Sequence, residues 1–251
     1  MKQTRGIYFS ISEHIPAARW CLAIIVIAFT AVVSVKKYID LADTASFSSL
    51  ETMFMILTDV MNIVFIYLPL YLFIVCGIMF DKGFGGLEIL RCSSRQHWLT
   101  GKLTAYIFNT LIFFAAMFAI NFIVCSRVFP FSSVWSSDFV AFRVMTGQPS
   151  MDFAYQPVPT ITAACAAVLL LYIFCGIVNM LVSLLTNRES TALFISLFAG
   201  IALGLANMII ASNGILEQVL RCIVLFAITA IAYALCISAV KKKDFGGKKM
   251  Y

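Results

Sequence analysis

Residues 80–102 of this chain read FDKGFGGLEILRCSSRQHWLTGK, the longest polar, charge-bearing passage that lies directly between two apolar runs of membrane length. Three glycines open the passage, and such a cluster favours a turn where a chain leaves a helix. Over residues 87–99 the apolar side chains recur at roughly helical spacing, while Glu88, Arg91 and Arg95 recur at i, i+3 and i+7. The pattern predicts a short helix lying across a membrane surface. Surface packing without further function is the alternative interpretation.

The composition indicates an integral membrane protein. Of the 251 residues, 62% are hydrophobic and 12% are charged. A soluble domain has about half apolar and about a quarter charged residues, so a soluble fold would not need this much apolar surface. The first apolar run begins near Trp20 without a small-x-small cleavage site after it, and we therefore expect no cleaved signal peptide.

Six apolar runs have roughly the 20 residues that cross a ~30 Å hydrocarbon core. The sequence thus predicts an all-α integral membrane protein with six transmembrane helices. We expect Pro69 to kink the second helix, because proline removes one backbone hydrogen bond. The predicted spans cover about residues 17–35, 60–80, 103–124, 161–185, 191–210 and 219–240.

The segments outside these runs differ in character. Residues 1–19 mix charged and apolar side chains, which predicts an interfacial helix lying flat before the first span. Residues 38–52 carry Asp40, Asp43 and Glu51 and are interpreted as a solvated loop. Residues 125–160 hold four prolines and seven bulky aromatic residues, which favour a cap packed on the ends of the spans or dipping into the interface. The tail, residues 241–251, is basic.

Lysine and arginine are unevenly divided between the two predicted compartments. Thirteen of the 18 lie on the side that holds both termini and residues 81–102, and five lie on the opposite side. The positive-inside rule therefore places both termini and the 81–102 loop in the cytoplasm, with residues 125–160 extracytoplasmic. The expected location is the cell membrane. The basic tail suits anionic lipid headgroups, and a nucleic-acid partner is not expected.

Residue patterns for catalysis or cofactor binding are not found in the sequence. The eight cysteines are scattered singly, without the paired spacing of a zinc or iron–sulfur site, although a disulfide between Cys125 and Cys222 is conceivable. The Gly101-Lys102 pair lacks the preceding glycine and the following Ser or Thr of a phosphate-binding loop. Asp59 is the one acidic residue expected within a span. We therefore expect neither an enzyme nor a bound cofactor or metal.

Neutral polar residues and small residues occur inside the predicted spans. Asparagines such as Asn121 and Asn179 are interpreted as structural hydrogen-bonding groups between helices, with the lining of a transport pathway as the alternative. Gly200 and Gly204 lie four residues apart in the fifth span, a spacing that lets another helix approach closely. That helix belongs either to the same chain or to a second copy across a dimer contact.

Three short strings resemble the loop after the second span of type-2 ATP-binding-cassette (ABC) exporter permeases: GLEIL at 86–90, SR at 94–95 and GKL at 101–103. In that family a Gly-Thr-Leu-Glu run, a Pro-x-Ser-Arg turn and a Gly-Lys pair recur at similar spacing. Here Gly86 stands in place of the usual threonine, and Cys92-Ser93 stands in place of the proline and its neighbour.

The resemblance implies that this loop is a coupling helix, which seats in a groove of a separate ATPase subunit. It implies two permease copies, or a copy and a paralogue, joined to two ATPase subunits that bind the ATP and magnesium. The substrate would be an amphipathic molecule such as a peptide, toxin, antibiotic or lipid. The coupling residues that it implies are Gly86, Leu87, Glu88, Leu90, Arg91, Ser94, Arg95 and Trp98.

Two other classes of function stay open at this stage. One is a secondary carrier or channel that works without an ATPase. The other is a membrane partner without transport activity, such as an immunity or sensor protein that sequesters a peptide. Co-purification of an ATPase with the chain would favour the exporter over both.

Overall fold

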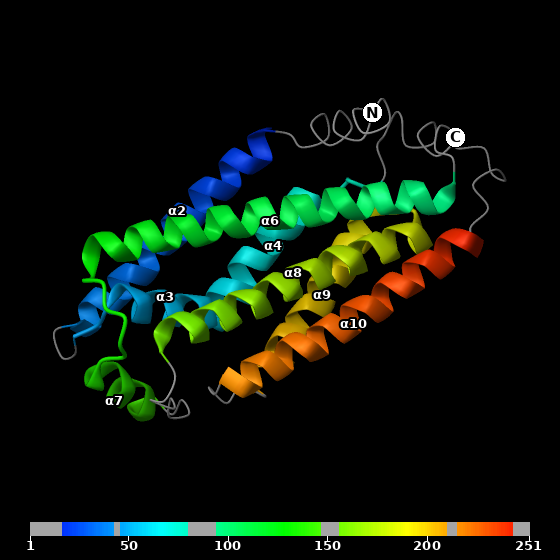
Figure 1. The fold of residues 1–251 in the computed structure, drawn as a ribbon. Helices are drawn as coiled ribbons and strands as arrows, with labels where there is room; N and C mark the ends of the chain where they lie inside the picture. The colour runs from blue at the N-terminus through cyan, green and yellow to red at the C-terminus, as the bar shows by residue number, and fades with distance from the viewer. Residues whose placement is uncertain (1–16, 43–45, 80–93, 147–155, 210–214, 243–251) are drawn as a thin grey trace, which may run out of the picture.

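A computed structural model describes residues 17–42, 46–79, 94–146, 156–209 and 215–242 (Figure 1). Every regular element within these ranges is helical. Long apolar stretches dictate this outcome, because a backbone in lipid must satisfy its own hydrogen bonds. In chain order the elements are α2 (Ala17–Ala42), α3 (Ser49–Thr58), the π-helix η1 (Met61–Tyr67), α4 (Leu68–Val75), α6 (Arg95–Val128), α7 (Ser137–Met145), α8 (Pro157–Thr186), α9 (Glu189–Ile209) and α10 (Ile215–Lys242).

Within these ranges, five helices are long and apolar enough to cross a membrane, and α3 with η1–α4 makes a sixth if that bent pair is one span. Their outward faces carry large apolar side chains, among them Phe29, Phe198 and Phe226 at 70%, 69% and 65% exposure. Water would not tolerate so many exposed apolar rings, whereas lipid would. The protein is therefore an all-α membrane protein.

The helices run roughly along one direction, with α8 in contact with α3, α6, α9 and α10. At one end of the bundle α4 ends, α6 begins, α8 ends, α9 begins and α10 ends (Figure 1). We call this the terminal end, because the described part of α10 stops there. At the opposite end α6 passes into α7 and α8 begins, and we call it the cap end. With 34 residues, α6 is about 50 Å long and extends beyond a ~30 Å hydrocarbon layer.

Span two differs from its prediction. The bend lies at Asp59, which has extended backbone angles, and the axes on either side differ by 57°. The 57° bend is therefore not at Pro69, where the kink was predicted. Pro69 lies in the first turn of α4, after a π-helical segment in which the Leu68 N–H donates to the Ile63 carbonyl five residues back. The wider π turn precedes the proline and gives its ring room that an α turn lacks.

The predicted loop at residues 38–52 is also wrong in part. Helix α2 continues to Ala42 and α3 begins at Ser49, so the connection between them is short. Glu51 is fully buried in the first turn of α3 rather than solvated. The described parts of residues 125–160 extend α6 to Val128, form α7 and begin α8 at Pro157. The chain turns tightly after α8, with Asn187 in the left-handed region at φ 56°.

Candidate functional site

The described half of the predicted coupling loop, residues 94–102, begins the long helix α6. The Ser94 side chain accepts a hydrogen bond from the His97 N–H at 3.1 Å and so caps the helix. Trp98 and Leu99 are buried at 4% and 1% exposure, while Arg95 is exposed. Contrary to the prediction, the helix therefore does not end at Leu99. Residues 95–99 instead belong to the first turns of α6, which forms span three. The serine cap explains why the helix starts here.

The other flank of the loop is held by an arginine. The Arg19 guanidinium of α2 donates from Nη1 to the carbonyls of Phe73 at 3.2 Å and Cys76 at 2.7 Å, at the end of α4. It also lies over the Phe73 ring at 5.1 Å. A cation at this position satisfies carbonyls that lack partners at a helix C-terminus. Gly77 then turns the chain with φ 95°, close to the Glu189 carboxylate of α9.

Residues 80–93 lie outside the described residues. They include five of the eight predicted coupling residues, namely Gly86, Leu87, Glu88, Leu90 and Arg91. Of the predicted interfacial helix, residues 17–19 form the start of α2 and the rest also lies outside. Lys241 and Lys242 of the basic tail end α10. What the structure shows of the site is thus its two flanks, the end of α4 and the start of α6.

The interior of the bundle contains a buried set of hydroxyl and amide groups. Tyr106 of α6 donates to Asn179 Oδ1 of α8 at 2.9 Å, and Asn179 Nδ2 donates to the Ser196 hydroxyl of α9 at 3.2 Å. Tyr71 of α4 hydrogen bonds Thr110 of α6 at 2.8 Å. These bonds join four helices, which agrees with the structural interpretation of the buried asparagines.

Tyrosine side chains hold the η1–α4 half of span two through hydrogen bonds of the same kind. Tyr67 hydrogen bonds Asn121 at 3.4 Å, and Tyr172 of α8 donates to the Ile63 carbonyl at 3.1 Å. The rings of Tyr71 and Tyr172 stack with centroids 5.3 Å apart. The π turn helps here, because the carbonyl of Ile63 accepts both from the backbone and from a side chain of a neighbouring helix.

The glycines of α9 pack within the same chain. A Cβ atom at Gly200 would lie 2.6 Å from Leu68 and from Cys175, and one at Gly204 would lie 2.7 Å from Val64. Both contacts are closer than real Cβ atoms allow, so these glycines let α9 approach α8 and the η1–α4 segment. Of the two interpretations that the sequence left open, packing inside one chain is the one that these contacts support.

The cap end is assembled from polar groups on two distant segments. Ser48 and Glu51 form a capping box at the start of α3, with Ser48 N–H donating to Glu51 Oε2 at 2.6 Å and Glu51 N–H donating to Ser48 Oγ at 3.3 Å. The other carboxylate oxygen of Glu51 accepts from the Ser136 N–H, just before α7. A second link runs in the opposite direction: Asp138 of α7 accepts hydrogen bonds from the N–H and the hydroxyl of Ser46, which precedes α3, at 2.9 and 2.7 Å.

Aromatic rings fill the space beneath these hydrogen bonds. Phe54 of α3 contacts Trp135 and Phe139 edge to face, with centroids 5.6 and 6.5 Å apart. The Arg143 guanidinium lies over Phe54 and Phe139 at 5.2 and 5.8 Å, and burial lowers the pKa of Arg143 to about 10. The aromatic residues of this segment thus pack as a cap on α3, one of the two arrangements expected for them.

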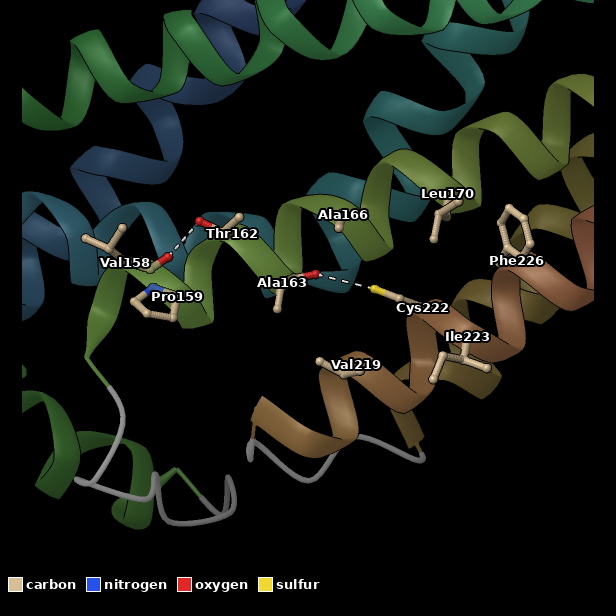
Figure 2. Close-up of a pocket in the computed structure, with 10 residues that line it drawn as sticks. All are labelled: Val158, Pro159, Thr162, Ala163, Ala166, Leu170, Val219, Cys222, Ile223 and Phe226. Carbon is tan, nitrogen blue, oxygen red and sulfur yellow. Dashed lines mark hydrogen bonds between the residues drawn. The ribbon is translucent and has the colours of Figure 1, made fainter.

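An apolar groove of about 800 Å³ lies between α8 and α10 (Figure 2). Its walls are small and branched side chains such as Ala163 and Ala166 of α8 and Ile223 of α10. The two polar side chains in the wall are turned to backbone carbonyls: Thr162 donates to Val158 at 2.8 Å and the Cys222 thiol to Ala163 at 3.8 Å. The groove can therefore hold an apolar group but offers little to a polar one.

Metal or disulfide chemistry has little support in the described ranges. Within them, no group of three or more His, Cys, Asp or Glu side chains could hold a metal ion. Cys125 and Cys222 are both free thiols, so the conceivable disulfide between them is not formed.

Residues 20–235 match the family described as Protein of unknown function (DUF2705). The chain belongs to this family. No curated protein and no solved structure matches it.

In this DUF2705 protein several structural residues escaped prediction. The Ser48-x-x-Glu51 spacing is a capping-box signature ahead of an apolar run, and could have revealed the start of α3. The role of Gly176 had no such signal. A Cβ there would lie 2.5 Å from the Tyr71 hydroxyl, so the glycine makes room for a ring from another helix. The partners of Arg19 and Glu51 lie 54 to 85 residues away, which no local pattern reveals.

Proposed function

We propose that this chain is the membrane-spanning permease subunit of an ABC exporter. The observation that carries the proposal is the pair of anchored flanks around the loop that resembles a coupling helix. On one side Arg19 holds the end of α4, and on the other side Ser94 caps α6 while Trp98 and Leu99 are buried. A push on the intervening residues would therefore act on the fixed ends of α4 and α6, which belong to spans two and three.

The proposed assembly contains two copies of the chain, or a copy and a paralogue, and two cytoplasmic ATPase subunits. ATP and magnesium bind the ATPase subunits, which is why the permease itself needs no nucleotide site. The bent pair of α3 and η1–α4 counts as the second of six spans. Both termini and the 81–102 loop are cytoplasmic in this proposal, in the cell membrane, and the cap end faces outward. An amphipathic peptide, toxin, antibiotic or lipid is the proposed substrate.

The coupling test reverses a charge at the start of α6. Arg95→Glu should weaken ATPase association, because removing one partner of an interfacial charge pair costs about 2–5 kcal/mol. The measurement is co-purification of the ATPase with the permease from a co-expressing strain, together with ATPase stimulation in nanodiscs.

Lys36→Glu is the matched control, since Lys36 is also exposed but lies toward the other end of α2. It should leave ATPase association unchanged. Equal association of wild type and Arg95→Glu would leave the loop as ordinary surface packing. Transport by the chain alone would favour the carrier class instead.

The topology test uses two exposed positions at opposite ends of the bundle. Cysteine at Ser133, near α7, should react with a membrane-impermeant thiol reagent in intact cells, while cysteine at Arg188 should react only after permeabilisation. Arg188 is preferred to its neighbour Asn187, whose positive φ makes cysteine strained there. A background in which the exposed native thiol Cys21 is replaced gives the control signal. Labelling of both positions in intact cells would rule out the six-span arrangement.

A further inference from the structure

We propose that α3 and α7 form one rigid lid over the cap end, and that this lid pivots as a unit about the break at Asp59 in span two. The proposal concerns a motion within the chain and does not depend on an ATPase partner. It rests on how the lid is fastened internally, how the break is built, and how the other half of span two is held.

The internal fastening of the lid is reciprocal. Glu51 on the α3 side accepts from the backbone of Ser136 on the α7 side, and Asp138 on the α7 side accepts from the backbone of Ser46 on the α3 side. The Ser136 hydroxyl also donates to the Ser46 carbonyl at 3.2 Å, and the Ser49 N–H donates to the Pro130 carbonyl at 2.9 Å. Because each segment supplies donors and acceptors to the other, the two helices cannot separate without breaking several bonds together.

Glu51 is the positioning residue of this arrangement. Its side chain is fully buried, and each of its two carboxylate oxygens accepts from a different backbone N–H, one from each segment. Hydrogen bonds to an ionised group are stronger than neutral ones, and a buried donor that loses its acceptor is costly. The carboxylate thus makes the first turn of α3 and the approach to α7 a single folded unit.

Aromatic packing makes the unit stiff. Phe54 is enclosed by Trp135, Phe139 and the Arg143 guanidinium, while Phe47 and Phe142 meet edge to face with centroids 5.5 Å apart. Interdigitated rings of this kind resist sliding, because few alternative packings fill the same space. The lid therefore moves as one body if it moves at all.

The break beside the lid has the structure of a hinge. Asp59 is extended, and its N–H reaches the Ile56 carbonyl at a long 3.4 Å. Its carboxylate accepts from the Met61 N–H at 2.9 Å, so the start of η1 is capped by a side chain and does not need α3 as a continuation. The two helical segments are joined at this point by Asp59 alone, because Val60 is already helical and the Ile63 N–H donates to the Asp59 carbonyl at 3.0 Å. The dihedral angles of Asp59 can change without breaking the ladder of either helix.

The other half of span two is fastened to a different set of helices. Asn62 donates to Ser34 of α2 at 3.0 Å, Tyr67 bonds Asn121 of α6, and Tyr172 of α8 reaches the carbonyl of Ile63. The lid meets α6 and α8 through α3, whose buried apolar side chains include Met53 and Ile56. A change of angle at α3 would therefore shift apolar contacts but break fewer hydrogen bonds than a change in the η1–α4 half.

Amide hydrogen exchange of the full chain in nanodiscs tests whether the lid is one unit. Glu51→Ala should raise exchange in both α3 and α7 by tenfold or more, and by similar factors, with little change in η1 and α4. Tyr67→Phe is the matched control and should act on η1 and α4 rather than on the lid. Faster exchange confined to α3 would overturn the proposal, as would an equal increase across span two.

Asp138→Asn is the second variant in case Glu51→Ala does not fold, because Asp138 is on the exposed side of the same junction. It should raise exchange in α3 and α7 together by a smaller, few-fold factor. An increase in α7 with α3 unchanged would again overturn the proposal.

Distance distributions between spin labels test the pivot itself. The labels are introduced through unnatural amino acids, so that the eight cysteines stay in place. The Thr58–Val144 pair lies within the lid and should give a narrow distribution, whereas the Phe65–Val144 pair spans the break and should give a broader one. Equally narrow distributions for the two pairs would show a fixed bend and refute the pivot.

Discussion

The two halves of span two are held in opposite ways. The half formed by α3 is fastened at its start by charged groups, Glu51 and Asp138, which bond backbone at the edge of the bundle. The half formed by η1 and α4 is fastened along its length by neutral hydroxyl and amide groups from three neighbouring helices. The charged groups lie at the cap end of the bundle, whereas the neutral hydrogen bonds lie between the long apolar helices, where an ionised group would be costly.

The different fastening of the two halves shows how one span can contain a part fixed in the core and a part bound to α7. Neutral contacts spread over several helices hold η1–α4 in the core. A concentrated polar junction binds α3 to α7 and leaves it joined to the core through Asp59 and apolar packing. Three experiments probe this contrast, and they are ordered by the size of the effect that we expect.

The largest effect is expected where α9 presses against the η1–α4 half. Leucine at both Gly200 and Gly204 would clash with Leu68, Cys175 and Val64. Overpacking at two sites should lower the free energy of unfolding by roughly 2–6 kcal/mol. Thermal unfolding in detergent measures the loss.

Gly101→Leu is the matched control for this pair, because a Cβ atom at Gly101 meets no atom within 4 Å. It should be close to neutral. If the double variant keeps wild-type stability but changes the association of two chains, the glycines serve a contact between copies and not the core.

A smaller loss is expected at the α3 half. Glu51→Ala leaves the buried N–H of Ser48 and the N–H of Ser136 without their acceptor. We expect the free energy of unfolding to fall by about 2–3 kcal/mol. Glu51→Gln keeps one acceptor oxygen and should lose about half as much, which chemical denaturation can resolve. Equal losses for both variants would mean that packing, not hydrogen bonding, is what Glu51 contributes.

The smallest effect concerns pH at the outer edge of the junction. Hydrogen bonds from the N–H and the hydroxyl of Ser46 lower the pKa of Asp138 below its ordinary value. A carboxylate with a depressed folded-state pKa stabilises the fold above its unfolded pKa of about 4, and the contribution is lost as the pH falls further. We therefore expect a slight drop in thermal stability below about pH 4. Asp138→Asn should remove this dependence, and an unchanged pH profile in that variant would assign it to other carboxylates.

Some features of span two and its neighbours could be predicted from the local sequence, and others could not. The apolar runs indicated an all-helical membrane protein, because length and composition are local properties that lipid selects directly. The turn at Asn187 and the cap at Ser94 follow from similarly local rules. The bend in span two was misplaced, since Pro69 is the obvious breaker in sequence while Asp59 is an ordinary polar residue.

The sequence by itself determined that the chain is helical, apolar and suited to a membrane, since those properties depend on the residues of one continuous segment. Tertiary structure alone decided that Glu51 is buried and shared with Ser136, that Gly176 accommodates Tyr71, and that Gly200 and Gly204 face the core. The physical reason is that each of these roles depends on a partner from another helix. The Glu51 carboxylate and the glycines have these roles only because packing brings their partners within a few ångströms.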